Sequence, residues 1–472
     1  MRFRYLVPLV ALLPLAHVAC VGDDPTPGSS GAAGEDGGAS GNDGGTGSSS
    51  SSSGGGDASS DAPVAISKVS GVVVSDVGTP VVGAIVRVEG RPESVTTGAD
   101  GKFSLDAPPT YDLTVAYPSN GTTSGSAVIA VLGLTTRAPS IEVVAGTTRK
   151  SPSVTLGVSG AGAGFFPLGT SNYVAFAFAP TANAEASGKL LLPGSNGSNA
   201  FTNYSWRGDA AASGNVHAFR YTIDDTTKLP TAFTASGQTS FTLTEGAAAT
   251  FTVPMYASSS AHVAGTIDYA GATPSSLSYT IRATGTSGHT FSSFTYDQAS
   301  FDLPMPSSTS YKAAVGVSGR GPGGGLATAW RVGLSQGVTN VKLVVPAEIA
   351  PTAPVDDARG VDATATTFSW QAAPAPFGTY QLAVSCGPGG LSVPEYSVTV
   401  LTASASAKLP DASKLGVSVP SGKTCTWSAT AMTAGSADDL AGPTGWLRFA
   451  QMRAATADGR VTTTVGRSFG TK

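Results

Sequence analysis

The stretch from Val69 to Pro118 alternates apolar with polar or small residues, and this alternation predicts short β-strands. Ala84, Val86 and Val88 share one face of such a strand, because successive side chains point to opposite sides. Asp100-Gly101 separates two alternating segments, and glycine readily adopts the positive φ that a tight hairpin turn requires. The pattern therefore predicts several strands joined by tight turns.

The motifs Gly71–Val74, Pro80–Val86 and Thr97–Leu105 resemble those of the carboxypeptidase regulatory-like domain. The resemblance implies a Greek-key β-sandwich of the prealbumin-like type. Despite its name, this domain is an accessory module without catalytic residues, and many secreted and surface proteins carry it. We expect the module to fold on its own, with Phe103 in its core.

The same order of features returns twice further along the chain. Phe301–Pro306 parallels Phe103–Pro108, and each segment follows an alternating stretch that contains a proline turn. Phe241–Gly246 and Phe251–Val253 resemble the end of such a module and indicate a middle copy. The repetition predicts three tandem sandwiches of about ninety residues each, a normal length for such folds.

The last part of the chain has a different strand pattern. Phe368–Trp370, Tyr380–Val384 and Thr424–Ala429 resemble strands of a fibronectin type III-like sandwich, with Trp370 as the buried tryptophan of an early strand. Within this segment, Asp438–Pro443 is expected to be an insertion, and Val461–Ser468 the last strand.

These patterns predict an all-β chain of tandem Greek-key β-sandwiches that follow a disordered linker. Three sandwiches are expected to be prealbumin-like, and one to be fibronectin type III-like. The expected division is a lipoprotein signal peptide at 1–20, a Gly/Ser-rich linker at 21–64, sandwiches at 65–157, 158–257 and 258–347, and the fibronectin type III-like sandwich at 348–472.

The N-terminal residues have the pattern of an export signal. Met1–Arg4 is basic, and Leu6–Val18 is apolar but too short to span a bilayer. The stretch ends at Cys20 and resembles the bacterial lipoprotein signal, which implies a lipid on this cysteine; an ordinary signal with an incidental cysteine is the alternative. Val21, rather than aspartate, follows the cysteine and favours the outer membrane. Residues 21–63 have no apolar periodicity, and as a flexible coil they would span roughly 35 Å.

Composition narrows the classes of partner. Only 12% of the residues are charged, about half the usual share, so much of the surface must consist of Ser, Thr, Ala and Gly. That surface suits a secreted β-protein. The 27 basic and 31 acidic residues form no basic block, and we therefore expect no nucleic-acid partner.

The sequence contains no convincing catalytic or metal-binding motif. His217, His262 and His289 lack the spacing of metal ligands, and we expect them on the surface or in turns. Asp224-Asp225 and Asp356-Asp357 could hold Ca²⁺, but such pairs are more typical of solvated turns. Neither a metal nor another cofactor is therefore expected, and the chain is not expected to be an enzyme.

Two other features suggest binding. Trp206 and Trp330 could be platforms on which sugar rings stack, although a tryptophan in a β-sandwich more often lies in the core. Arg207-Gly208-Asp209 spells an adhesion tripeptide, and we interpret it as a chance occurrence.

Three cysteines are present, and lipidation would use Cys20. Cys386 and Cys425 then remain as an even pair in an exported protein, where disulfides persist. In the fibronectin type III-like resemblance the strands that carry them are antiparallel neighbours, which implies a disulfide. Two free, buried thiols are the alternative.

The sequence thus favours a non-enzymatic lipoprotein of the cell envelope, with a structural, adhesive or protein-binding role. Its expected partners are the membrane, through the lipid anchor, and envelope proteins or polysaccharide. The alternatives are a carbohydrate-binding surface protein and an accessory subunit of an exported hydrolase.

Overall fold

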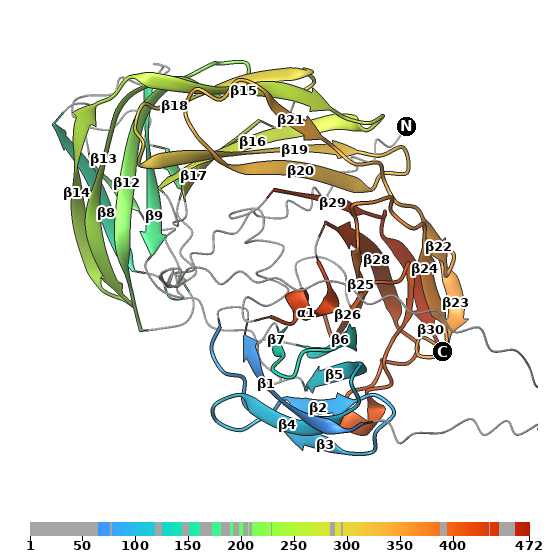
Figure 1. Cartoon of the computed structure of the whole chain (residues 1–472). Coiled ribbons are helices and arrows are strands. Elements are labelled where there is room, and N and C mark those ends of the chain that lie inside the picture. The colour runs from blue at the N-terminus through green and yellow to red at the C-terminus, as the bar shows by residue number, and fades with distance from the viewer. Residues whose placement is uncertain are drawn as a thin grey trace, which may run out of the picture.

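The computed structural model describes residues 65–75, 78–118, 125–143, 150, 152–160, 172–180, 189–191, 198–201, 206, 210–227, 229–283, 288–293, 296–387, 394–433, 435–442 and 458–472. The fold is all-β, as the sequence predicts. The described residues form strands β1 to β30 and add only one short α-helix and one 3₁₀ helix. In Figure 1 four parts follow one another around the molecule.

The first repeat, at the bottom of Figure 1, forms two facing sheets. One sheet has the order β4-β1-β7, and the other contains β3-β2-β5-β6. Its strands are β1 (Ser67–Ser75), β2 (Ile85–Val88), β3 (Ser94–Thr96), β4 (Lys102–Ala107), β5 (Tyr111–Tyr117), β6 (Ser126–Leu134) and β7 (Ser140–Val143).

The third repeat has the same topology as the first. Its sheets have the orders β18-β15-β21 and β17-β16-β19-β20. The strands are β15 (Ser260–Asp268), β16 (Thr273–Ala283), β17 (Gly288–Ser293), β18 (Ser300–Pro306), β19 (Tyr311–Arg320), β20 (Leu326–Leu334) and β21 (Val341–Val344). In both repeats the first strand runs antiparallel to the fourth and parallel to the seventh.

The second repeat follows the same pairing order, with one difference. Its strands are β8 (Ser153–Gly160), β9 (Asn172–Pro180), β10 (Lys189–Leu191), β11 (Ser198–Phe201), β12 (Ala211–Ile223), β13 (Pro230–Thr244) and β14 (Ala248–Ala257). Residues 235–237 of β13 also pair with 255–257 of β14, and this contact joins the two sheets into one. Because β8 pairs with β14, the boundary expected between 157 and 158 falls inside the first strand of this repeat and lies instead before Ser153.

A glycine and a phenylalanine occupy matching positions in the first and third repeats. Phe103 on β4 lies opposite Gly71 on β1, and Phe301 on β18 lies opposite Gly265 on β15. A Cβ on Gly71 would lie 2.5 Å from the Phe103 ring, and one on Gly265 would lie 2.8 Å from the Phe301 ring. Only glycine leaves room for the ring, so the paired residues explain the shared motif. Phe103 is 5% exposed and lies in the core, as predicted.

The described part of the C-terminal module consists of two sheets and two short helices. The sheet β22-β24-β27 faces a second sheet that contains β26-β25-β28, and β30 pairs with both β28 and β23. The elements are β22 (Pro351–Ala353), β23 (Ala358–Val361), β24 (Thr367–Trp370), β25 (Thr379–Cys386), β26 (Tyr396–Thr402), β27 (Ser406–Lys408), the 3₁₀ helix η1 (Ser413–Leu415), β28 (Thr424–Met432), α1 (Ala437–Leu440), β29 (Gly459–Thr463) and β30 (Arg467–Thr471). Trp370 is 4% exposed, in agreement with its expected burial.

The expected last strand, Val461–Ser468, is divided into β29 and β30. Between them, the Thr464 amide donates to the Ala429 carbonyl. β29 pairs with one end of β28 and with β20 of the third repeat, whereas β30 pairs with the other end of β28. The division therefore lets one segment serve two modules.

One continuous sheet, which we call the bridging sheet, runs through three of the four parts (Figure 1). Its order is β17-β16-β19-β20-β29-β28-β25-β26-β6-β5-β2-β3. β26 lies parallel to β6 of the first repeat, and β29 lies antiparallel to β20 of the third. The C-terminal module thus covers one edge strand of each of these repeats.

The first repeat shares its hydrophobic core with the C-terminal module. Leu401, Met432, Leu440 and Ala441 are at most 5% exposed and belong to the same cluster as Phe103. These residues complete the core of the first repeat from more than 250 positions away, so this core, unlike that of a module that folds on its own, includes distant residues.

The second and third repeats also share a core. Phe219, Tyr221 and Phe233 of the second repeat join Phe291 and Tyr311 of the third. The rings of Tyr221 and Phe291 lie edge to face with centroids 5.0 Å apart. Both faces of the β9-β12-β13 sheet are therefore buried, one inside the second repeat and the other against the third.

Candidate functional site

The two tryptophans proposed as sugar platforms differ in how far their side chains are exposed to solvent. Trp206 is 1% exposed and lies in the core of the second repeat, so its assignment as a platform is wrong. Trp330 is half-buried on β20. Gly459 of β29 lies against its ring, since a Cβ on this glycine would be 2.4 Å from Cζ2 of Trp330. Part of the Trp330 ring is thus covered by the C-terminal module.

Of the three histidines expected on the surface or in turns, His262 lies on the surface, whereas His217 and His289 do not. His217 and His289 are 2% exposed and lie on strands, because the packing of the second repeat on the third covers them. Burial lowers the pKa of His217 to about 4, so it is neutral at pH 7. His262 is half-exposed, with Nδ1 2.8 Å from Oδ1 of Asp302.

Neither acidic pair assembles a cation site. Asp224 Oδ1 accepts hydrogen bonds from the amides of Thr226 and Thr227, at 2.9 and 2.7 Å, and so caps a turn. Asp356 Oδ1 accepts from the Ser468 amide at 2.7 Å. Among the residues that the structure describes, no three His, Cys, Asp or Glu side chains lie together in a metal-binding arrangement.

Cys20 and Arg207-Gly208-Asp209 lie outside the described residues. Within the described part of the chain, none of the helices has the length and apolar character needed to cross a bilayer.

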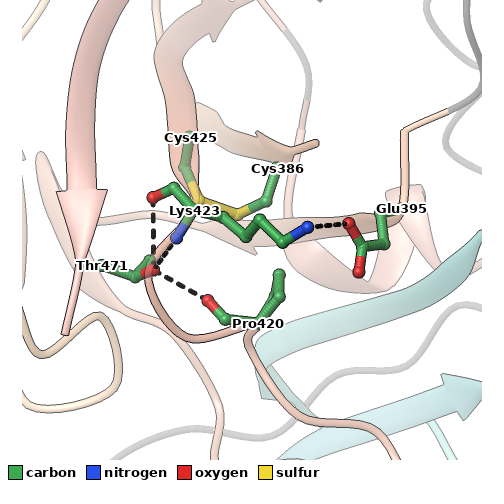
Figure 2. Close-up of a disulfide and its surroundings, with 6 residues drawn as sticks. All are labelled: Cys386, Glu395, Pro420, Lys423, Cys425 and Thr471. Carbon is green, nitrogen blue, oxygen red and sulfur yellow. Dashed lines mark hydrogen bonds and ion pairs between the residues drawn. A yellow bond between two sulfur atoms is a disulfide. The ribbon is translucent and has the colours of Figure 1, made fainter. Parts of the chain in front are cut away.

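Cys386 and Cys425 form a disulfide (Figure 2). They are directly opposite each other on antiparallel β25 and β28, with their Cα atoms 4.0 Å apart. Directly beside the bond, Lys423 forms an ion pair with Glu395 at 3.1 Å (Figure 2). The Glu395 carbonyl accepts from the amide of Ser126 in the first repeat at 3.0 Å. The disulfide therefore fixes the end of the C-terminal module where the module meets the first repeat.

Helix α1 forms a second contact with the first repeat. Its Asp438 carboxylate accepts from the amides of Thr135 and Thr136 at 2.8 and 2.9 Å, and also from the Thr135 hydroxyl. Partial burial by itself would raise the pKa of Asp438, but these hydrogen bonds together outweigh it and lower the pKa. The Ser140 amide donates to the Ala441 carbonyl at 2.7 Å. The helix is thus bonded to the loop that joins β6 to β7.

A buried arginine makes the third contact between these two parts. Arg87 on β2 is 7% exposed. Its Nη2 donates to the Asp411 carbonyl of the C-terminal module at 2.9 Å and lies 3.1 Å from Oε2 of Glu89. Glu89 Oε1 also accepts from the Thr114 hydroxyl at 2.6 Å. The charge is paired inside the interface, as a buried arginine requires.

A glycine-rich turn holds the segment that leaves the third repeat. The Glu348 carboxylate accepts from the amides of Gly323 and Gly325, at 2.8 and 2.6 Å. A Cβ on Gly325 would lie 2.2 Å from the Thr463 carbonyl oxygen and 2.5 Å from Glu348 Oε1. The turn, Glu348 and β29 are therefore packed too closely for any other residue at position 325.

The C-terminal module also contains a hollow of about 260 Å³. Its lining residues come from the loop before β24, the start of β26, the segment between β27 and β28, and the end of β30. Tyr396, Asp362, Asp411 and Lys472 are its titratable lining residues. No sequence motif identified this hollow, because loops far apart in the chain form it.

No family model matches this chain, and no curated protein matches it. Among solved structures, the Bacillus anthracis TIE protein is 11% identical, with 59% of this chain and 50% of that chain covered and a TM-score of 0.15. A leucine-rich repeat protein from Bacteroides thetaiotaomicron is 13% identical, with 42% and 26% covered and a TM-score of 0.16. BcpA, the major pilin subunit of Bacillus cereus, is 8% identical, with 59% and 98% covered and a TM-score of 0.13.

The chain thus spans half the length of the TIE protein and about a quarter of the leucine-rich repeat protein. With such low TM-scores these likenesses carry no argument about function.

Proposed function

We propose that this chain is a non-enzymatic lipoprotein of the bacterial cell envelope that works through the surfaces of its tandem β-sandwiches, in a structural, adhesive or protein-binding role. The observation that supports the proposal best is the bridging sheet, in which the C-terminal module pairs with both the first and the third repeat. An arrangement of this kind suits a protein that must hold its shape and present surfaces.

Edge strands with unpaired backbone groups recruit other chains and promote aggregation. In this protein β6 and β20 are paired by β26 and β29 of the same chain. The exposed faces of the repeats then remain for selective contacts, while two edges that could pair nonspecifically are occupied. Paired edges limit aggregation while the free faces can bind, and this combination suits a binding scaffold that is present at high local concentration on a surface.

The anchor is the other half of the proposal. A lipid on Cys20 would hold the chain at the membrane, with the outer membrane favoured. Residues 21–64 would act as a tether with a reach of roughly 35 Å, which would keep the folded modules clear of the lipid surface.

The anchor is tested by cell fractionation of Cys20→Ala. We expect the wild type in the membrane fraction and the variant in the soluble fraction. The double variant Cys386→Ala/Cys425→Ala is the matched control, because it removes two cysteines but keeps the lipid site and should stay with the membrane. A Cys20→Ala chain that remains membrane-bound, together with a wild-type intact mass without lipid, would contradict the proposal.

The binding role is tested by passing envelope extract over the immobilised chain. We expect the folded chain to retain an envelope protein or polysaccharide that the same chain, reduced and unfolded, does not retain. Hydrolase activity that disappears on a single Asp, Glu or His substitution would contradict the non-enzymatic assignment.

A further inference from the structure

The hollow in the C-terminal module contains a buried polar side chain. Tyr396 is 2% exposed and lines the hollow. Its side chain forms part of the wall of the hollow. Burial, with a smaller contribution from Asp411, raises the pKa of Tyr396, so the phenol keeps its proton. A protonated phenol can donate one hydrogen bond, and a ligand in the hollow could accept it.

The position of Tyr396 is fixed by the disulfide. Tyr396 starts β26 directly opposite Cys386 on β25, and Cys386 is bonded to Cys425 on β28. Three neighbouring strands therefore hold the base of the hollow. A rigid base is what a binding site requires, because side chains that are already ordered lose less conformational entropy when a ligand binds.

Two carboxylates lie at the hollow. Asp362 Oδ2 is 3.1 Å from Lys472 Nζ, and Oδ1 accepts from Thr364 and Ala365; these contacts, with Lys472 the largest, hold the pKa of Asp362 at about 2. Asp411 Oδ1 accepts from the hydroxyl and the amide of Ser413, at 2.6 and 3.1 Å, which lowers the pKa of Asp411. Both carboxylates are therefore ionised at pH 7 and can accept further hydrogen bonds.

The charges, apolar residues and volume of the hollow indicate which class of ligand it can bind. Its two carboxylates outnumber the ammonium group of Lys472, which Asp362 already engages, so the hollow disfavours an anion. Val417, Val419 and Pro420 add an apolar wall. The volume lies below the range of drug-sized pockets, so it suits a single ring.

We propose that this hollow binds one pyranose unit of a carbohydrate. The sugar hydroxyls donate to the carboxylates of Asp362 and Asp411 and accept from Tyr396, while the C–H face of the ring lies against Val419 and Pro420. The proposal moves carbohydrate binding away from the tryptophans and does not rest on the structural role proposed above.

The test is saturation-transfer NMR on the full chain with the methyl pyranosides of glucose, galactose, mannose and N-acetylglucosamine. Because the full chain with its proposed lipid is kept in detergent, that detergent must lack a sugar headgroup. An alkyl glycoside detergent would compete with the methyl pyranosides for the hollow. We expect at least one glycoside to bind with a Kd of about 1 mM, as a single small ring with few contacts allows. If none of the four binds at 20-fold that concentration, on the order of 20 mM, the proposal is wrong.

Three variants locate the binding. Tyr396→Phe removes only the phenol, and we expect affinity to fall about fivefold, the equivalent of one hydrogen bond. Ser418→Trp fills the hollow from its exposed rim and should abolish binding. Tyr380→Phe, a matched change in the same module but outside the hollow, should leave the affinity unchanged. Binding that survives Ser418→Trp at wild-type affinity would overturn the assignment.

Discussion

Helix α1 should stabilise the first repeat although the two lie about 300 residues apart. Leu440 is 1% exposed and packs in the cluster that also contains Phe103. Truncation of a buried leucine to alanine costs about 2–5 kcal/mol, depending on how well the cavity collapses. Because the cavity would open inside the first repeat, we expect Leu440→Ala to destabilise that repeat by an amount in this range.

Hydrogen exchange with mass spectrometry measures this effect locally. A loss of about 2 kcal/mol raises the population of open states about 30-fold, so amides of β4 and β5 should exchange at least that much faster. Leu156→Ala is the matched control, since Leu156 is fully buried in the core of the second repeat. It should leave β4 and β5 unchanged. Faster exchange confined to α1 in Leu440→Ala would refute the shared core.

Three further outcomes are expected. Removal of the disulfide in Cys386→Ala/Cys425→Ala should lower the free energy of unfolding of the C-terminal module by up to about 4 kcal/mol, because the bond closes a loop with a sequence separation of 39. Urea titration measures this loss, and a loss below about 1 kcal/mol would argue against a structural role of the disulfide. The pKa of His217 is lowered from 6.5 to about 4 in the folded state, so only the unfolded state gains a proton between these values, and stability should fall by up to about 3 kcal/mol as the pH drops from 6.5 to 4. Urea midpoints of the wild type and of His217→Phe at pH 7 and pH 4.5 isolate this contribution, which should be missing in the variant. Gly325→Ala should lower the free energy of unfolding by about 1–3 kcal/mol in a thermal melt, since its Cβ would meet the Thr463 carbonyl. The control Gly316→Ala, where the nearest contact of a Cβ is at 3.4 Å, should lower it by less. Equal losses in the two variants would contradict the close packing around Gly325.

Much of the fold inside each repeat could be predicted from local patterns. The alternation of Ala84, Val86 and Val88 predicts the inner face of β2 and of the residue directly before it, and all three are at most 1% exposed. The motif around Phe103 returned around Phe301, and both residues lie on the strand that pairs with the first strand of their repeat. These predictions succeeded because side chains alternate with a period of two in any strand, whatever surrounds it.

The errors arose where a second element covers a surface that the local pattern leaves open. The sequence predicts His217 on the surface or in a turn, but the third repeat buries it against Tyr311. Trp206, the other possible platform besides Trp330, lies in the core of its own repeat, which is the more usual place for a tryptophan in a β-sandwich. The hollow around Tyr396 has no local sequence pattern, because its lining comes from four separate segments.

Local residue patterns suffice to predict the class of fold, the positions of several strands and the faces that point into each sandwich, because those depend on neighbouring residues. What covers the other faces and edges depends instead on contacts between distant parts of the chain. The Arg87 side chain bonds to Asp411, 324 positions away, and β6 finds its partner in β26. Such contacts leave no local periodicity, because they depend on how the C-terminal module returns to the first repeat, and this return is what turns separate sandwiches into one bridging sheet.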